Sequence, residues 1–287
     1  MEKKLTNFAI TYNTQIPESQ ALGERIAAFL DKQGGNTHST CRVQDEPLQA
    51  CINRREVDAL IVLGGDGTML RACHLCAAAR IPIVGINLGT MGFLIELQEG
   101  DWMDYLPRLI AGDYRIEERM MLKAEHMRGE ENLGSWQVVN EVVVCRGSNV
   151  RPVSLTTAVD GYPMASYVAD GIIAATPTGS TAYALAAGGA ILPPDVRNII
   201  MVPIAPHLSP DQSIVLPEGA QVSISMHKGY GAVFSVDGHE PVLVEDGDQV
   251  NVSASENNTL FVRFHGPGFF YRSLNRYLEW NPTFSRK

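Results

Sequence analysis

Residues 63–68 read LGGDGT, so a single carboxylate, Asp66, lies among three glycines. An apolar run at residues 59–63 leads into the glycines, and a helical pattern follows from Thr68, its predicted cap, to about Ala79. Glycine loops between a strand and a helix commonly bind phosphate, because free backbone N–H groups and the positive end of the helix dipole meet there. Taken alone the segment is also compatible with a plain turn, and a negative charge in a phosphate loop needs a chemical reason.

The first third of the chain alternates strand and helix patterns. An amphipathic helix is predicted over residues 19–30, and short apolar strands are predicted at residues 8–10, 59–63 and 81–86. Strands separated by helices imply a parallel sheet. A second glycine-containing loop, NLGTMGF at residues 87–93, follows the last of these strands. Because loops after adjacent parallel strands lie at the same edge of a sheet, we expect the two loops to converge.

Beyond about Arg115 strand patterns dominate. Asp160-Gly161 and Asp237-Gly238 are typical of hairpin turns. Strands are predicted at residues 137–145, 153–159, 221–226, 232–236, 249–253 and 260–264. The sequence therefore predicts two domains. One is an α/β domain with a parallel, Rossmann-like sheet, formed by residues 1–115 and joined by the tail 268–287. The other is a β-rich, antiparallel, sandwich-like domain formed by residues 116–267.

Asn140 and Glu141 place an amide and a carboxylate inside a run of β-branched residues. A buried carboxylate is costly without a partner, so Glu141 needs either a ligand or a structural arginine. Neighbours on a regular strand face opposite sides of the sheet. Both side chains can therefore serve one site only near a bulge, a strand end or a seam between domains.

Residues 170–183 read DGIIAATPTGSTAY, a strand followed by a hydroxyl-rich turn and a short Ala-rich helix. Small side chains allow a ligand to approach closely, hydroxyl groups can bond a base or a sugar, and Tyr183 can stack on an aromatic ring. The alternative is a capped helix with a satisfied tyrosine. It is improbable that the LGGDGT loop, the Asn140-Glu141 pair and residues 170–183 all have purely structural roles in one chain.

The composition excludes several classes of protein. The chain has 32 acidic and 23 basic residues, a net charge of -9, and the basic residues are scattered, which argues against nucleic-acid binding. There is no apolar run of roughly 18 residues and no secretory signal pattern at the N-terminus, so neither a membrane span nor secretion is expected. Five cysteines without a regular spacing favour the reducing cytoplasm.

Four motifs in this order resemble those of the NAD kinase family: GGDG at residues 64–67, NxGxxGFL at 87–94, NE at 140–141 and DG…TPTGSTAY at 170–183. The resemblance spans most of the chain, and NE together with TPTGSTAY is its most specific part. It implies ATP-dependent phosphorylation of the 2′-hydroxyl on the adenosine ribose of NAD, giving NADP. Asp66 would then be the general base that takes the proton of that hydroxyl.

The resemblance also implies a set of ligand contacts. Mg²⁺ or another divalent cation with ATP, and backbone N–H groups at Gly65, Gly67 and Thr68, would offset repulsion between Asp66 and the phosphates; no direct side-chain metal ligand is predicted. The expected ATP- and phosphate-binding residues are Gly64, Gly65, Gly67, Thr68, Arg71, Asn87 and Gly89. The expected NAD-binding residues are Asp66, Gly67, Phe93, Asn140, Glu141, Arg151, Asp170, Thr178, Thr181, Ala182, Tyr183, Ala184, Leu185, Ala186 and His239.

Within the second set, the resemblance assigns Glu141 to a ribose hydroxyl, Tyr183 to stacking on a ligand ring, and Asp170 to the nicotinamide end of a ligand bound mainly by a neighbouring subunit. A homodimer or homotetramer is therefore expected. The sequence departs from the family at Val168, where many relatives carry Arg. Two rivals stay open: a GGDG-type lipid kinase, which would leave NE and TPTGSTAY unexplained, and a non-catalytic dinucleotide-binding sensor.

Overall fold

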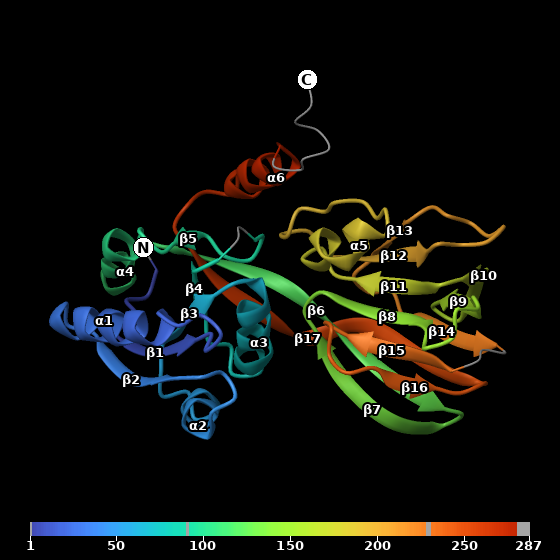
Figure 1. The fold of residues 1–287 in the computed structure, drawn as a ribbon, viewed down its shortest axis with the longest axis horizontal. Helices are drawn as coiled ribbons and strands as arrows, with labels where there is room; N and C mark the ends of the chain where they lie inside the picture. The colour runs from blue at the N-terminus through green and yellow to red at the C-terminus, as the bar shows by residue number, and fades with distance from the viewer. Residues whose placement is uncertain (1, 90–91, 228–230, 280–287) are drawn as a thin grey trace. The chain divides into compact units, whose positions relative to one another are not determined.

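The computed structural model of the 287-residue chain describes residues 2–89, 92–227 and 231–279 (Figure 1). The chain divides into two compact units. Residues 1–118 and 259–287 form the first unit, and residues 119–258 form the second. Strands β6 (Arg115–Arg128) and β17 (Asp248–Arg263) carry residues of both units. None of the described helices is long and apolar enough to cross a membrane.

A parallel sheet with the order β4-β3-β1-β2 forms the centre of the first unit. Helix α1 packs on β1 and β2, and helix α3 packs on β3 and β4. The short strand β5 and the end of β17 also pair with β4 in parallel. The strands are β1 (Asn7–Tyr12), β2 (Asn36–Cys41), β3 (Ala59–Gly64), β4 (Ile83–Asn87) and β5 (Leu97–Gln98). The helices are α1 (Ser19–Lys32), α2 (Glu46–Asn53), α3 (Asp66–Ala77), α4 (Trp102–Ala111) and α6 (Phe269–Glu279).

Apolar patterning accounts for this arrangement. Every residue of β3 is buried, as expected of a strand covered on both faces. On α1 the predicted stripe of Leu22, Ile26 and Leu30 is buried against the sheet. Gly34, with φ +88°, takes the left-handed conformation that glycine tolerates just after a helix. The alternation of strand and helix therefore produces the predicted parallel sheet.

The second unit contains two antiparallel sheets. One has the order β13-β12-β11-β8-β15-β16, and the other pairs β10, β9, β14 and β17, with β6 and β7 alongside. A single apolar core contains residues of both, for example Val142 and Phe234 from the first and Leu155 and Val222 from the second. The bounds are β7 (Glu131–Val138), β8 (Glu141–Arg146), β9 (Val153–Val159), β10 (Tyr162–Ala169), β11 (Gly171–Ala175), β12 (Asn198–Ile204), β13 (Ile214–Pro217), β14 (Val222–His227), β15 (Ala232–Val236) and β16 (Val242–Val244).

The predicted fold class is confirmed: an α/β unit with a parallel sheet and a β-rich antiparallel unit. Both predicted hairpin turns also form. Asp160-Gly161 joins β9 to β10, and Asp237-Gly238 joins β15 to β16, with φ between +51° and +81° at all four residues. This backbone is the one that type I′ hairpin turns require.

Three details of the prediction are wrong. The strand expected over residues 137–145 is broken, because β7 ends at Val138 and β8 begins at Glu141. The two strands expected at 249–253 and 260–264 are one continuous strand, β17. Helix α3 begins at Asp66 rather than being capped by Thr68. The short Ala-rich helix, by contrast, forms as predicted: it is α5 (Tyr183–Ala186), preceded by the 3-10 turn η1 (Gly179–Thr181).

Candidate active site

Asp66 is the first residue of α3, and one residue, Gly65, separates it from the end of β3. Its carboxylate accepts hydrogen bonds from the backbone N–H of Phe93 at 2.8 Å and of Leu94 at 3.3 Å. A Cβ atom at Gly92 would lie 2.2 Å from Asp66 Oδ1, so only glycine lets the carboxylate approach this backbone. The structure therefore brings the two predicted glycine loops together in the first unit, and the Asp66 side chain itself joins them.

The first turn of α3 differs from the expectation in its hydrogen bonding. The Thr68 N–H donates to the Gly65 carbonyl at 2.9 Å, so it is already engaged within the protein. The Thr68 side chain is buried, and a Cβ at Gly64 would lie 2.7 Å from its Oγ1. At Gly65 and Gly67, by contrast, an added Cβ would meet open space, so the backbone of these two glycines is approachable. The approachable part of the loop is Gly65 to Gly67.

Asn87 ends β4, as predicted, but its side chain is used within its own loop. Its Nδ2 donates to the Gly89 carbonyl at 3.2 Å and to Gln98 Oε1 at 3.3 Å, while its Oδ1 accepts the Gly89 N–H at 3.2 Å. Such local side-chain bonds stabilise the conformation of a loop. We therefore assign Asn87 to shaping the loop that contains Gly89.

A cavity of about 490 Å³ lies in the first unit beside α3. Arg71 and Thr68 line it from α3, and Arg71 Nη2 donates to Thr68 Oγ1 at 3.3 Å. Arg42 adds a second guanidinium and is paired with Asp45 at 2.8 Å. The complete lining is Tyr12, Asn13, Thr14, Gln15, Arg42, Val43, Gln44, Thr68 and Arg71.

Sequence reasoning found Thr68 and Arg71 but missed the rest of this lining. The other residues are Tyr12, the last residue of β1, and members of the loops that follow β1 and β2. Those strands are parallel neighbours of β3, so the same edge rule that linked the first two loops also applies to them. Polar loops after every parallel strand were the signal that could have identified the cavity.

In the second unit, the break between β7 and β8 is held by Asp237. Its carboxylate accepts three successive backbone N–H groups, from Val139 and Asn140 at 2.7 Å and from Glu141 at 3.0 Å. Asp237 is itself buried at the hairpin turn after β15. Because Asn140 and Glu141 lie at a strand end, they escape the strict alternation of a regular strand. The sequence predicts Asp237 only as a turn residue and gives no sign that its carboxylate binds the backbone of residues 139–141.

Glu141 is buried, and its Oε2 atom has no hydrogen-bond partner among the described residues. Burial, followed by the nearby charge of Asp237, raises the pKa of Glu141 to about 8, while a hydrogen bond from the Tyr183 backbone opposes the shift. The structural arginine that the sequence left open as a partner does not bond this oxygen within the described part of the chain. A buried oxygen with unused acceptor capacity is unusual and calls for a ligand donor.

The TPTGSTAY turn packs directly on this break. The Thr176 N–H donates to the Asn140 carbonyl at 2.8 Å, and Thr176 Oγ1 donates to the Val139 carbonyl at 2.7 Å. A Cβ at Gly179 would lie 2.2 Å from the Asn140 oxygen, so the close approach requires glycine. The structure thus brings Asn140 and Glu141 together with the turn that contains Thr178, Thr181 and Ala182 and with α5, which contains Tyr183, Ala184, Leu185 and Ala186.

Within this group, side-chain exposure differs. Thr178 and Ala184 are buried, whereas the Tyr183 side chain is 44% exposed and is available to a ligand. Asp170 forms an ion pair with Arg146 at 2.9 Å. Arg151 and His239 are exposed in the loops after β8 and β15. These last two expected NAD-binding residues lie on loops rather than in the packed turn.

The fold and these two clusters define a nucleotide-binding α/β protein with a second, antiparallel unit, and comparison with known proteins identifies its family. Residues 1–114 match the ATP-NAD kinase N-terminal domain, and residues 139–264 match the ATP-NAD kinase C-terminal domain. An NAD kinase of Dehalococcoides mccartyi is 34% identical over 98% of both chains. An NAD kinase of Heliobacterium modesticaldum is 39% identical over 94% of this chain and 97% of that protein. The chain belongs to the NAD kinase family of enzymes.

Solved structures share the fold. A yeast NADH kinase complexed with NADH superposes with a TM-score of 0.87 at 24% identity, covering 99% of this chain and 91% of that one. An NAD kinase from Archaeoglobus fulgidus in complex with ATP gives a TM-score of 0.75 at 24% identity, covering 94% of this chain and 98% of that one. Both the predicted family and the predicted fold class are thus confirmed.

Proposed function

We propose that this chain transfers the γ-phosphoryl group of ATP to the 2′-hydroxyl of the adenosine ribose of NAD, giving NADP, with Asp66 as the general base. The observation that carries this proposal is the Asp66 carboxylate, fixed at the start of α3 by the N–H groups of Phe93 and Leu94. The same helix lines the cavity that contains Arg42 and Arg71. A held carboxylate next to a cationic cavity suits proton abstraction coupled to phosphoryl transfer.

The chemical step follows from that assignment. Asp66 takes the proton of the 2′-hydroxyl, and the ribose oxygen forms a bond to the γ-phosphorus. The bond from that phosphorus to the β–γ bridging oxygen breaks, and ADP leaves with its electron pair. The hydrogen bonds from Phe93 and Leu94 restrict the direction of the carboxylate, so the base is oriented before the substrate arrives.

We assign the donor to the first unit. Arg71 and the Asp45-paired Arg42 place two guanidinium groups at the cavity, and the backbone at Gly65 and Gly67 is open to a close ligand. Among the described residues that line the cavity there is no carboxylate, so a divalent cation such as Mg²⁺ would be carried on the phosphate oxygens of ATP itself. The metal would neutralise charge that develops on those oxygens.

We assign the acceptor mainly to the second unit. Glu141 Oε2, buried and lacking a hydrogen bond, would accept one from a ribose hydroxyl of NAD. Asn140, Thr178, Thr181 and Ala182 would hold the adenine region, and the exposed ring of Tyr183 would stack on the ligand. Phe93, in the first unit, would contribute an apolar wall. The remaining expected contacts, from Arg151, Asp170, Ala184, Leu185, Ala186 and His239, belong to the same proposal, as do a cytoplasmic location and a homodimer or homotetramer.

Steady-state formation of NADP from NAD, ATP and Mg²⁺ tests this function, with NAD binding measured in parallel. Asp66→Asn keeps the size of the side chain and removes the base, so turnover should fall by about 10²- to 10⁴-fold. NAD should still bind to the variant, because most of the expected adenine and ribose contacts lie elsewhere in the chain.

Three other results would count against the proposal. Turnover by Asp66→Asn at the wild-type rate would remove Asp66 from its role as base. NAD binding by the wild type without NADP formation would favour a dinucleotide sensor. Phosphorylation of a diacylglycerol-type lipid in place of NAD would favour a GGDG lipid kinase.

A further inference from the structure

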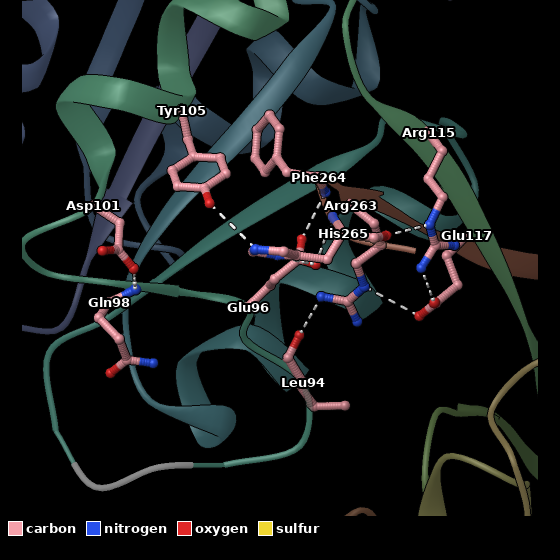
Figure 2. Close-up of polar contacts among 10 residues, drawn as sticks. All are labelled: Leu94, Glu96, Gln98, Asp101, Tyr105, Arg115, Glu117, Arg263, Phe264 and His265. Carbon is pink, nitrogen blue, oxygen red and sulfur yellow. Dashed lines mark hydrogen bonds and ion pairs between the residues drawn. The ribbon is translucent and has the colours of Figure 1, made fainter. Parts of the chain in front are cut away.

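Two charged side chains, Arg263 and Glu96, attach residues 94–96 to the residues at the end of β17 (Figure 2). Neither side chain has a role in the proposed chemistry. The first is Arg263, the last residue of β17, which is 4% exposed. Its Nη1 donates to the Leu94 carbonyl at 2.9 Å, and its Nε donates to Glu117 Oε1 at 3.1 Å. The guanidinium thus binds a backbone oxygen in one direction and a compensating carboxylate in another.

The connection to Asp66 is short. Leu94 donates its N–H to Asp66 Oδ1 at 3.3 Å and accepts Arg263 Nη1 on its carbonyl. Arg263 and Asp66 therefore hold the two peptide groups that flank one residue. A shift of the Leu94 backbone would redirect the N–H groups that orient the carboxylate, and small misplacements of a catalytic group are costly in rate.

Glu96 supplies the second attachment, two residues further along. Its side chain is 2% exposed and accepts the backbone N–H of Phe264 at 2.8 Å and that of His265 at 3.0 Å. The ring of His265 adds a third contact, from Nδ1 to Glu96 Oε1 at 2.9 Å, and its Nε2 lies 3.2 Å from the Tyr105 hydroxyl. Residue 94 is therefore tied to Arg263, the last residue of β17, and residue 96 to Phe264 and His265, which follow it.

Glu117 is itself held in place. Arg115 Nη2 lies 3.1 Å from Glu117 Oε2, and Arg115 Nε donates to the His265 carbonyl at 2.8 Å (Figure 2). Because Arg263 is buried, its charge would be costly without this carboxylate. The buried guanidinium therefore donates to the Leu94 carbonyl while its charge is balanced by Glu117.

We propose that Arg263 is a positioning residue for the reaction: by holding the Leu94 carbonyl it fixes the N–H groups that orient Asp66. This inference rests on the proposed function, because it needs Asp66 to be the base. Arg263 touches neither substrate nor the reacting atoms in this account. Its removal therefore lowers kcat and leaves the KM for NAD unchanged.

Arg263→Lys is the first test, because it keeps the buried charge and loses the fork that reaches Leu94 and Glu117 together. Arg128→Lys is the control: Arg128 binds Asp248 through Nε at 2.8 Å and Nη2 at 3.0 Å, and both residues belong to the second unit. We expect Arg263→Lys to lower kcat by about 10- to 100-fold, with the KM for NAD unchanged and the control at the wild-type rate.

Amide hydrogen exchange of residues 92–96 gives a readout independent of catalysis. Exchange at Phe93 and Leu94 should accelerate in Arg263→Lys and stay at the wild-type rate in Arg128→Lys. Wild-type kcat in Arg263→Lys, or unchanged protection of these two amides, would overturn the proposal. If the wild-type protein makes no NADP, the proposed function fails by that result alone, while the exchange measurement still decides whether Arg263 orders the segment.

Discussion

Asp66 begins helix α3 and Glu141 begins strand β8, but the protein bonds the oxygens of these two carboxylates differently. Asp66 accepts a backbone N–H on each oxygen, from Phe93 and Leu94. Glu141 is buried with one oxygen lacking any hydrogen bond among the described residues, and its pKa is raised to about 8. One carboxylate is oriented by the protein and suited to act on a substrate, whereas the other retains capacity for a donor that only a ligand would bring.

A third carboxylate, Asp237, makes the contrast clearer. It accepts three backbone N–H groups and so stabilises the break that displays Asn140 and Glu141. The second unit therefore contains one carboxylate that holds the strand break and one with an oxygen that has no hydrogen-bond partner among the described residues. In the first unit a single carboxylate, Asp66, both joins two loops and faces the proposed chemistry.

The largest expected effect concerns the stability of the free protein as a function of pH. A carboxyl group whose folded pKa is raised from 4.5 to about 8 binds its proton more tightly when folded, so its contribution to stability is full below pH 4.5 and is lost as pH rises towards 8. Glu141→Gln mimics the protonated form and removes this loss. Relative to wild type, the variant should gain about 3 kcal/mol between pH 5 and pH 8.

Urea unfolding of both proteins at these two pH values measures that gain. Glu240→Gln, at an exposed position, provides the control and should follow the wild type. A stability difference between Glu141→Gln and wild type that does not depend on pH would mean that Glu141 titrates normally and is not the unsatisfied carboxylate described above.

Gly92→Ala tests the orientation of the Asp66 carboxylate. The added methyl group would meet the Asp66 carboxylate at 2.2 Å and force it off the Phe93 and Leu94 N–H groups. We expect kcat to fall by up to about 100-fold while NAD affinity is kept. At Gly100 an added Cβ meets open space, so Gly100→Ala is the matched control and should turn over normally. Equal kcat values for the two variants would show that the position of Asp66 is unimportant.

Asp237→Asn tests whether the strand break depends on its carboxylate. An amide can present only one oxygen to three N–H donors, so at least one buried donor loses its partner. We expect a loss of about 1–3 kcal/mol in the free energy of unfolding, together with weaker NAD binding. Asp195→Asn, at an exposed residue, should leave both quantities unchanged. Loss of stability without any change in NAD affinity would separate Asp237 from the ligand site.

The smallest expected effect is a change in bound protons. If a ribose hydroxyl donates to Glu141, NAD favours the ionised form and lowers the pKa of this group from about 8. At pH 7 binding should then release up to about one proton, detectable by titration calorimetry in two buffers of different ionisation enthalpy. Asp66→Asn should still release it, and Glu141→Gln should not. Proton uptake on binding would contradict the assigned contact.

Much of the architecture was predictable because local pattern and tertiary packing agree. The buried strand β3 and the stripe of α1 follow from apolar spacing, and Asp160-Gly161 forms its turn because the dipeptide accepts positive φ. The convergence of the two glycine loops at Asp66 could be predicted because loops after adjacent parallel strands meet at one edge of a sheet. Wherever the local signal and the packing coincide, the prediction is confirmed.

Other features depend on residues far apart in the sequence. The break at residues 139–140 interrupts a β-branched run because Asp237, almost a hundred positions later, binds its amides. In β17 the polar stretch near Ser255 predicts an interruption, but Ser255 bonds Gln137 and the Asn257 N–H, and the strand continues. Arg263 and Glu96 gave no motif at all, since their roles arise from pairing across the first unit. Such contacts cannot be read from spacing.

The division of roles between Asp66 and Glu141 is the central claim, and the single-turnover rate of NADP formation tests it most directly. The enzyme is saturated with NAD and MgATP, so that binding no longer limits the rate. The account predicts that Asp66→Asn is slower by orders of magnitude at saturation, while Glu141→Gln, once saturated, approaches the wild-type rate. A saturated Asp66→Asn variant as fast as wild type, or a saturated Glu141→Gln variant as slow as Asp66→Asn, would contradict it.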